Sequence, residues 1–175
     1  MSSKLRILTH HTFRSQQKSA GRPSMHSEDV RDRFQEMILA HNEHPLGLGD
    51  VDHPTHDAVA YNPFCGDRFH IRLTVSDGAI QEIGFDGMGC ALSRASASMM
   101  VGFATGRTVS EFGQACQRLA SALKGGIDPE DRLEDLGDAG ALLPARSSPH
   151  RVRCALLAWD AACRSLGLQA GRSGG

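Results

Sequence analysis

Apolar residues alternate with polar ones through residues 68–75, where Phe69, Ile71, Leu73 and Val75 are separated by arginine, histidine and threonine. This period of two predicts a β-strand with one buried face. Ser76-Asp77-Gly78 follows as a turn, and residues 79–85 return as the partner strand of a hairpin. A shorter stretch at residues 57–61 is a plausible first strand. The pattern therefore predicts a small antiparallel sheet of three strands.

Helical spacing of apolar residues and capping signals predict helices on both sides of this hairpin. The first helix begins at the N-cap residue Ser27 and ends before Pro45. A segment rich in small residues follows Cys90, and a capping box at residues 108–111 starts the next helix. The last helix begins after Pro149 and ends at a glycine. The fold class predicted from these elements is α+β, a small antiparallel three-stranded sheet packed by helices.

The remaining segments set the domain boundaries. Residues 1–24 are basic, rich in serine and poor in apolar periodicity, so we expect a disordered extension before a domain at residues 25–168. Either Met25 is the true start, or the extension is a targeting leader. Residues 124–148 are acidic and interrupted by glycine and proline, which indicates either an ordered insertion or a mobile loop. Residues 169–175 are expected to be a disordered tail.

Composition narrows the function classes. A net charge of -1 argues against general nucleic-acid binding, which needs a basic excess. The sequence contains no apolar run approaching the roughly 20 residues of a membrane span, and its start lacks the apolar core of a secretory signal. Five cysteines, an odd number, then indicate a reducing, cytoplasmic environment. In such an environment thiols serve as ligands, nucleophiles or core residues rather than disulfides.

Three of the cysteines are candidates for a metal and sulfur site. The predicted hairpin brings Cys90 back close to Cys65 and Asp67, and the last helix is expected to place Cys154 beside them. These three cysteines are expected at element boundaries rather than on apolar stripes. A helix start at Cys90 and the arginines beside Cys154 would favour their thiolates. Three thiolates and a carboxylate are enough for a tetrahedral zinc site, and they supply three of the four thiolates that usually hold an iron–sulfur cluster.

Other candidates for chemistry have simpler explanations. Cys116 lies on the apolar stripe of the third helix, and Cys163 lies on that of the last helix, so both are expected to be inert core thiols. A cluster of histidines is expected to be a solvated loop rather than a metal site, because none pairs with a cysteine at helical or turn spacing. Its members are His41, His44, His53 and His56.

Three motifs then give a specific resemblance across residues 27–166. They are Asn62-Pro63-Phe64-Cys65-Gly66-Asp67, the segment from Gly87-Met88-Gly89-Cys90 to Met100, and Arg151-Val152-Arg153-Cys154-Ala155. Together they resemble the SufU family, zinc-dependent sulfurtransferases related to the IscU and NifU scaffold proteins. The scaffold branch carries a Leu-Pro-Pro-Val-Lys motif and a histidine just before the third cysteine, where this chain has Arg153. The SufU branch instead has an insertion before the last helix and an Arg-x-x-Cys sequence, matched here by residues 124–148 and 151–154.

The resemblance implies an IscU/SufE-like fold with zinc held by Cys65, Asp67, Cys90 and Cys154. It implies that Cys65 accepts persulfide sulfur from a SufS-type, pyridoxal-phosphate cysteine desulfurase, with Arg151 at the position implicated in transfer. In such proteins a desulfurase histidine can replace the acceptor thiolate on zinc. The sulfur then passes to a downstream scaffold for iron–sulfur cluster assembly. The alternative is an IscU-like scaffold on which the same residues hold a transient iron–sulfur cluster.

Overall fold

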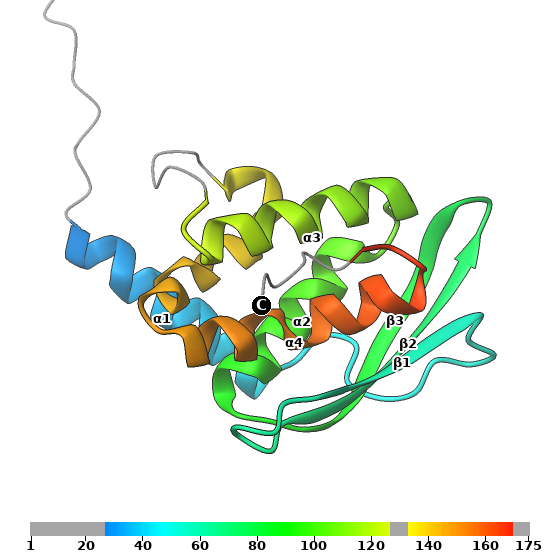
Figure 1. The fold of residues 1–175 in the computed structure, drawn as a ribbon, viewed down its shortest axis with the longest axis horizontal. Coiled ribbons are helices and arrows are strands. Elements are labelled where there is room, and N and C mark those ends of the chain that lie inside the picture. The colour runs from blue at the N-terminus through cyan, green and yellow to red at the C-terminus, as the bar shows by residue number, and fades with distance from the viewer. Residues whose placement is uncertain (1–26, 127–132, 170–175) are drawn as a thin grey trace, which may run out of the picture.

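The computed structural model describes residues 27–126 and 133–169, and its elements follow the predicted order closely. Helix α1 precedes three strands, and helices α2 and α3, the 3₁₀ segment η1 and helix α4 follow them (Figure 1). The predicted extension at residues 1–24 lies outside the described residues, as does nearly all of the predicted tail. The bounds are α1 Ser27–Glu43, β1 His56–Tyr61, β2 Arg68–Ser76, β3 Ala79–Met88, α2 Ala91–Ala104, α3 Val109–Leu123, η1 Leu133–Ser147 and α4 Pro149–Ser165.

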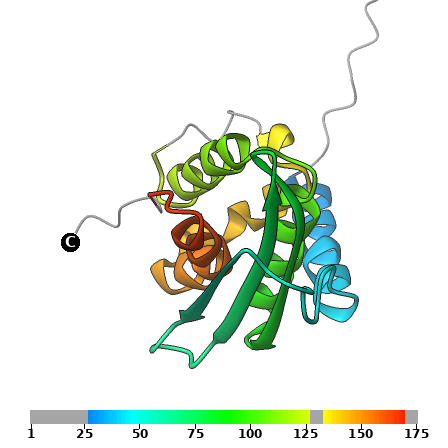
Figure 2. The same cartoon turned by 90° about the vertical axis from the view of Figure 1, so that its right-hand side faces the viewer.

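The sheet is antiparallel in the order β1-β2-β3, as the alternating pattern predicts. Arg68 pairs with Met88 at one end of the β2–β3 hairpin, and Ser76 pairs with Ala79 at the turn. Phe69, Ile71 and Leu73 on β2 are buried. This buried face lies against the helices, because α4 packs on β1 and β2 while α2 packs on β3. Figure 2 shows α3 and α4 together on one side of the strands.

Helix α3 begins where its capping signal predicts. The Thr108 side chain accepts a hydrogen bond from the Glu111 N–H, and the Glu111 carboxylate accepts one from the Thr108 N–H. These reciprocal bonds satisfy two amide groups that a helix start otherwise leaves unpaired. The side chains of Phe112, Leu119 and Leu123 on the inner face of α3 are then buried in the core.

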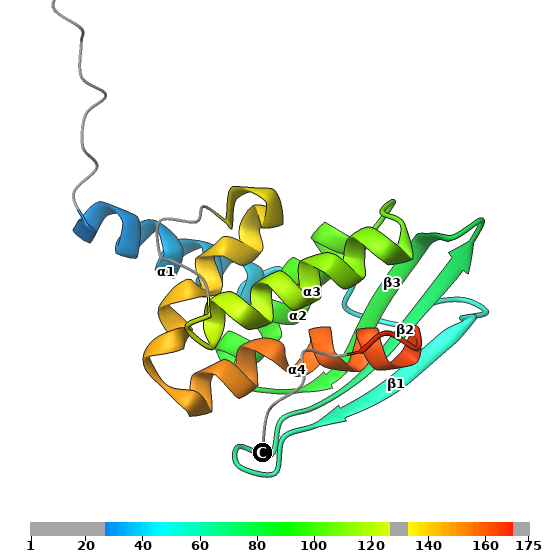
Figure 3. The same cartoon turned by 45° about the horizontal axis from the view of Figure 1, so that its top comes forward.

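The predicted choice between an ordered insertion and a mobile loop is resolved for residues 133–147. They form η1, a 3₁₀ segment with a kink at Gly137, which packs against all four helices (Figure 3). Residues 124–126 follow α3, and residues 127–132 lie outside the described residues. The ordered part carries buried apolar side chains at every third position, which suits a helix of three residues per turn. These are Leu133, Leu136, Ala139, Leu142 and Ala145.

No helix in residues 27–126 and 133–169 has the length and apolar character needed to cross a membrane.

Candidate metal centre

The loop between β1 and β2 carries Cys65 and Asp67 and is tightly folded by its own backbone. The Asn62 N–H donates to the Asp67 carbonyl at 2.9 Å, and the Gly66 N–H donates to the Asn62 carbonyl at 2.9 Å. Gly66 has a φ of 74°, in the left-handed region that glycine adopts without steric cost. The tight bend leaves Cys65 exposed and Asp67 buried.

Asp67 is 3% exposed and joins the two ends of the hairpin. Its Oδ1 accepts a hydrogen bond from the Cys90 N–H at 3.0 Å, because the pairing of Arg68 with Met88 brings these segments side by side. Burial raises the pKa of the Asp67 carboxyl, but the neighbouring Cys65, Ser93 and Cys90 groups outweigh it and lower the pKa overall. The other oxygen, Oδ2, is buried without a hydrogen-bond partner. A buried carboxylate oxygen without a partner is costly unless a cation satisfies it.

Cys154 completes a compact group with these two residues. Its sulfur lies 3.8 Å from the sulfur of Cys65, and the ligand atoms of Cys65, Asp67 and Cys154 all lie within 4.8 Å of one another. Asn62 Nδ2 donates to the Cys154 sulfur at 3.7 Å, and His150 Nδ1 lies 3.9 Å from it. Two sulfurs and a carboxylate oxygen thus converge on one point from the β1–β2 loop and helix α4.

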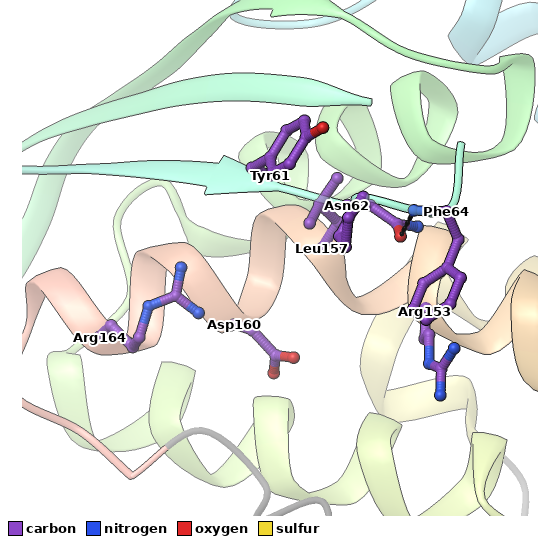
Figure 4. Close-up of a pocket in the computed structure, with 8 residues that line it drawn as sticks. Tyr61, Asn62, Phe64, Arg153, Leu157, Asp160 and Arg164 are labelled. Atoms are coloured by element: carbon purple, nitrogen blue, oxygen red, sulfur yellow. Dashed lines mark hydrogen bonds between the residues drawn. The ribbon is translucent and has the colours of Figure 1, made fainter. Parts of the chain in front are cut away.

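The setting of Cys154 differs from the sequence prediction in two respects. It lies within α4 and is 3% exposed, not at an element boundary. The neighbouring arginines were expected to favour its thiolate, but both are exposed, and Arg153 stacks on the Phe64 ring at 4.5 Å from the centroid (Figure 4). Burial instead raises the pKa of the Cys154 thiol, and the nearby sulfurs of Cys90 and Cys65 raise it further. Partial desolvation also raises the pKa of the Cys65 thiol.

Cys90 lies beside this group with its sulfur engaged elsewhere. It is the N-cap of α2, where its sulfur accepts a hydrogen bond from the Ser93 N–H at 3.4 Å. The sulfur of Cys90 is not among the ligand atoms within 4.8 Å of one another, but it lies near enough to Cys154 to raise the pKa of that thiol, and the Cys90 N–H donates to Asp67. The close approach of the hairpin ends also requires Gly87, since a Cβ there would overlap the Arg68 carbonyl oxygen. Cys90 is positioned by the same contacts that close the hairpin.

The site contains two polar residues that sequence analysis did not identify as site residues. Asn62 is 4% exposed; its N–H donates within the loop and its side chain donates to the Cys154 sulfur, so it ties the loop to α4. His150 reaches the same sulfur from the preceding turn of α4. The available signal for Asn62 was its place at the end of the first predicted strand, where it opens the motif that contains Cys65 and Asp67, whereas the position of His150 depends on how α4 packs.

The histidine cluster was only partly a solvated loop. His41 lies on α1, where Nδ1 is 2.7 Å from the Ser98 hydroxyl and Nε2 is 3.0 Å from an Asp138 oxygen. It therefore joins α1, α2 and η1 in a structural role. His44 and His53 are exposed, and His56 starts β1 with its ring 2.7 Å from the Thr55 hydroxyl.

Comparison with known proteins places this site in a family. The sequence profile of the NifU-like N-terminal domain matches residues 33–167, which include all four predicted metal ligands. The chain belongs to the NifU-like N-terminal domain family. The family assignment accords with the predicted SufU, IscU and NifU resemblance and with the α+β fold.

The chain is similar to named proteins of both kinds that the sequence analysis weighed, a sulfurtransferase and a scaffold. The chain is 30% identical over 131 residues to the zinc-dependent sulfurtransferase SufU of Bacillus subtilis, covering 73% of this chain and 85% of the relative. It is 30% identical over 129 residues to the iron–sulfur cluster assembly scaffold protein IscU of Streptococcus pyogenes, covering 73% and 79%. The crystal structure of a nitrogen-fixing NifU-like protein (N-terminal) from Brucella abortus matches with a TM-score of 0.69 and 26% identity, covering 79% of this chain and 95% of that one.

The two remaining cysteines of this NifU-like domain are core residues, as predicted. Cys116 on α3 is 4% exposed and Cys163 on α4 is 0% exposed, and burial raises the pKa of the Cys116 thiol far above its usual range. Replacing either with alanine should lower the free energy of unfolding by about 1 kcal/mol, because a small buried group is lost. Zinc stoichiometry should be unchanged in both variants. Denaturant unfolding and metal analysis check this, and loss of zinc from either variant would overturn the proposed ligand set.

Proposed function

We propose that this chain is a zinc-dependent sulfurtransferase that serves iron–sulfur cluster assembly by accepting sulfur from a SufS-type cysteine desulfurase. The observation that carries the proposal is the placement of an exposed Cys65 sulfur against the buried Cys154 sulfur and the partnerless Asp67 oxygen. The similarity to the Bacillus subtilis sulfurtransferase supports the same activity. Similarity to IscU proteins supports the wider role in cluster assembly.

The residues of the site suit a zinc ion. Cys65, Asp67 and Cys154 already converge, and Cys90 would complete the set by turning its sulfur from the Ser93 N–H toward them. Sulfur and carboxylate oxygen are ligands that zinc accepts. Asp67 Oδ2 is a buried acceptor that needs a cation, and the raised pKa values of the Cys65 and Cys154 thiols keep both protonated at neutral pH without one. A bound zinc ion would hold the sulfurs as thiolates and protect them from oxidation.

Of the three thiols, Cys65 is the best suited to accept sulfur. Cys154 is buried, and the Cys90 sulfur caps α2 through Ser93. Cys65 is exposed and lies on the β1–β2 loop, so its sulfur is accessible to a partner protein. We therefore assign Cys65 as the sulfur acceptor and assign Asp67, Cys90 and Cys154 as the residues that hold the zinc ion beside it.

The reaction of Cys65 is a sulfur transfer between two proteins. The Cys65 thiolate attacks the outer sulfur of a persulfide on the desulfurase cysteine, in a step analogous to thiol–disulfide exchange. A bond forms between the Cys65 sulfur and the outer sulfur, and the sulfur–sulfur bond of the donor breaks. Its electron pair leaves with the desulfurase cysteine as a thiolate. Arg151, exposed near the start of α4, is our candidate for stabilising negative charge during the transfer.

An IscU-like scaffold is the second candidate function, and one contact favours it. The absence of a histidine next to Cys154 in the sequence argues for the SufU branch, yet His150 lies 3.9 Å from the Cys154 sulfur in the folded chain. A histidine is thus available to a cluster bound at the same site. The similarity to IscU of Streptococcus pyogenes, also 30%, supports this alternative.

Metal analysis together with a sulfur-transfer assay separates the two candidates. Freshly purified protein should be colourless and contain about one equivalent of zinc, as expected for a single tetrahedral site. With a cognate desulfurase and cysteine carrying labelled sulfur, the chain should acquire labelled persulfide. A coloured protein that contains iron and sulfide and transfers a cluster to an apo-acceptor would contradict the sulfurtransferase assignment and support the scaffold.

A further inference from the structure

A groove of about 540 Å³ opens beside the proposed metal centre, between α1, η1 and the starts of α2 and α4. Helix α1 and η1 lie side by side in Figures 1 and 3, although they are distant in the sequence. Leu92, two residues after Cys90, lines the groove at one end, and Arg151, one helical turn before Cys154, lines it as well. A segment bound in this groove would therefore contact the starts of the two helices that hold Cys90 and Cys154.

The floor of the groove is apolar. Phe34, Ile38 and Leu92 are half-buried side chains that pack on the core with their inner sides and line the groove with the remainder, and Pro144 adds a further apolar surface. The volume is within the range of about 300–1,000 Å³ typical of ligand pockets. The floor has room for one bulky apolar side chain of a partner.

The rim of the groove is basic. Arg31, Arg146 and Arg151 are exposed and line it, and no carboxylate does. Among residues 27–126 and 133–169, none of these three guanidinium groups has an ion pair or hydrogen bond recorded with another residue. The whole chain has a net charge of -1, so this cluster is a local concentration of positive charge and not part of a basic protein. Arginines without a partner among the described residues, placed around an apolar floor, favour an acidic partner segment with an apolar anchor.

We propose that this groove docks an acidic segment of the sulfur-donating desulfurase, with an apolar side chain on the floor and carboxylates at Arg31 and Arg146. The inference rests on the proposed function, because it takes the sulfur donor as the partner. Seated there, the donor would be held beside Cys65. The arginines of the rim would raise the association rate and select the partner by charge.

The test compares two pairs of substitutions that lower the net charge equally. Arg31→Gln with Arg146→Gln removes rim charges, whereas Gln114→Glu with Gln117→Glu adds charges on exposed positions of α3, which does not line the groove. The rim variant should weaken the Kd for the desulfurase roughly tenfold at low salt, the size expected for two partly exposed ion pairs. The difference should shrink at high salt. Arg31→Lys with Arg146→Lys should retain most of the affinity.

Transfer at saturating desulfurase and zinc content should be unchanged in the rim variant, since neither arginine belongs to the metal centre. A Kd within about twofold of the wild-type value, or an equal loss in the α3 control, would overturn the docking proposal. So would a wild-type chain that binds RNA or anionic phosphatidylserine vesicles through the rim and does not bind the desulfurase.

The docking proposal and the proposed function fail in different ways. If the rim variant transfers sulfur with the wild-type KM for the desulfurase, the docking proposal is wrong, whereas the proposed sulfurtransferase activity still stands. If the chain binds a desulfurase through the rim arginines but never receives sulfur from it, the docking proposal stands and the proposed sulfurtransferase activity is wrong.

Discussion

Replacing Cys65 with serine should reduce the sulfur carried by this chain to background, a loss on the order of a thousandfold or more in transfer rate. A serine hydroxyl is a far weaker nucleophile than a thiolate at neutral pH, and the substitution also removes one of the proposed zinc ligands. The measurement is single-turnover transfer of labelled sulfur from a loaded desulfurase, followed by mass spectrometry of the acceptor. In the wild-type chain the added sulfur should map to the peptide that contains Cys65.

Cys163→Ser is the matched control, because it makes the same chemical change in a thiol that is fully buried in the core. This variant should still acquire sulfur on Cys65. If persulfide forms on Cys65→Ser at the wild-type rate, Cys65 is not the acceptor. If Cys65→Ser carries no sulfur but stimulates the desulfurase as the wild-type chain does, the protein is better described as a non-catalytic zinc module that activates its partner.

Most of the fold could be predicted because its signals are local. The alternation of Phe69, Ile71 and Leu73 identifies a half-buried strand, and Thr108 with Glu111 identifies the start of α3. The segment η1 could not be assigned by the same methods. Its glycines, Pro144 and acidic residues fit either an ordered insertion or a mobile loop, and its buried residues recur every three positions rather than at the α-helical period.

The candidate site was predictable in part for a related reason. Hairpin register brings Asp67 to Cys90, and that pairing follows from the strand pattern and the turn. The position of Cys154 in the site depends on the packing of α4 across the sheet, which is a long-range contact that no local sequence pattern encodes. For that reason sequence analysis selected Cys154 as a thiol off the apolar stripes but misjudged its burial, and it did not identify the approach of His150.

The packing of α4 against α2 has a central residue, Trp159, whose replacement with alanine should lower the free energy of unfolding by about 3–5 kcal/mol. Its side chain is 0% exposed and stacks on Phe112 with ring centroids 5.8 Å apart. Its indole N–H donates to the Ser96 hydroxyl at 3.1 Å, and that hydroxyl donates to the Ala155 carbonyl at 2.5 Å. Such a loss is a large part of the free energy of unfolding of a typical domain, which is about 5–15 kcal/mol. Circular dichroism during denaturant unfolding measures it.

A double-mutant cycle tests the hydrogen-bonded part of this contact even if Trp159→Ala does not fold. Ser96→Ala leaves a buried indole N–H without an acceptor and should cost about 1–3 kcal/mol. Trp159→Phe with Ser96→Ala should cost less than the sum of the two single variants by about 1 kcal/mol, because no donor is then left unpaired. Strictly additive costs would contradict this account of the contact.

The same variants should also loosen the proposed metal centre, because α2 carries the Cys90 cap and α4 carries Cys154. Each destabilised variant should lose zinc to a chelator faster than the wild-type chain, whereas Gln114→Glu on the exposed face of α3 should not.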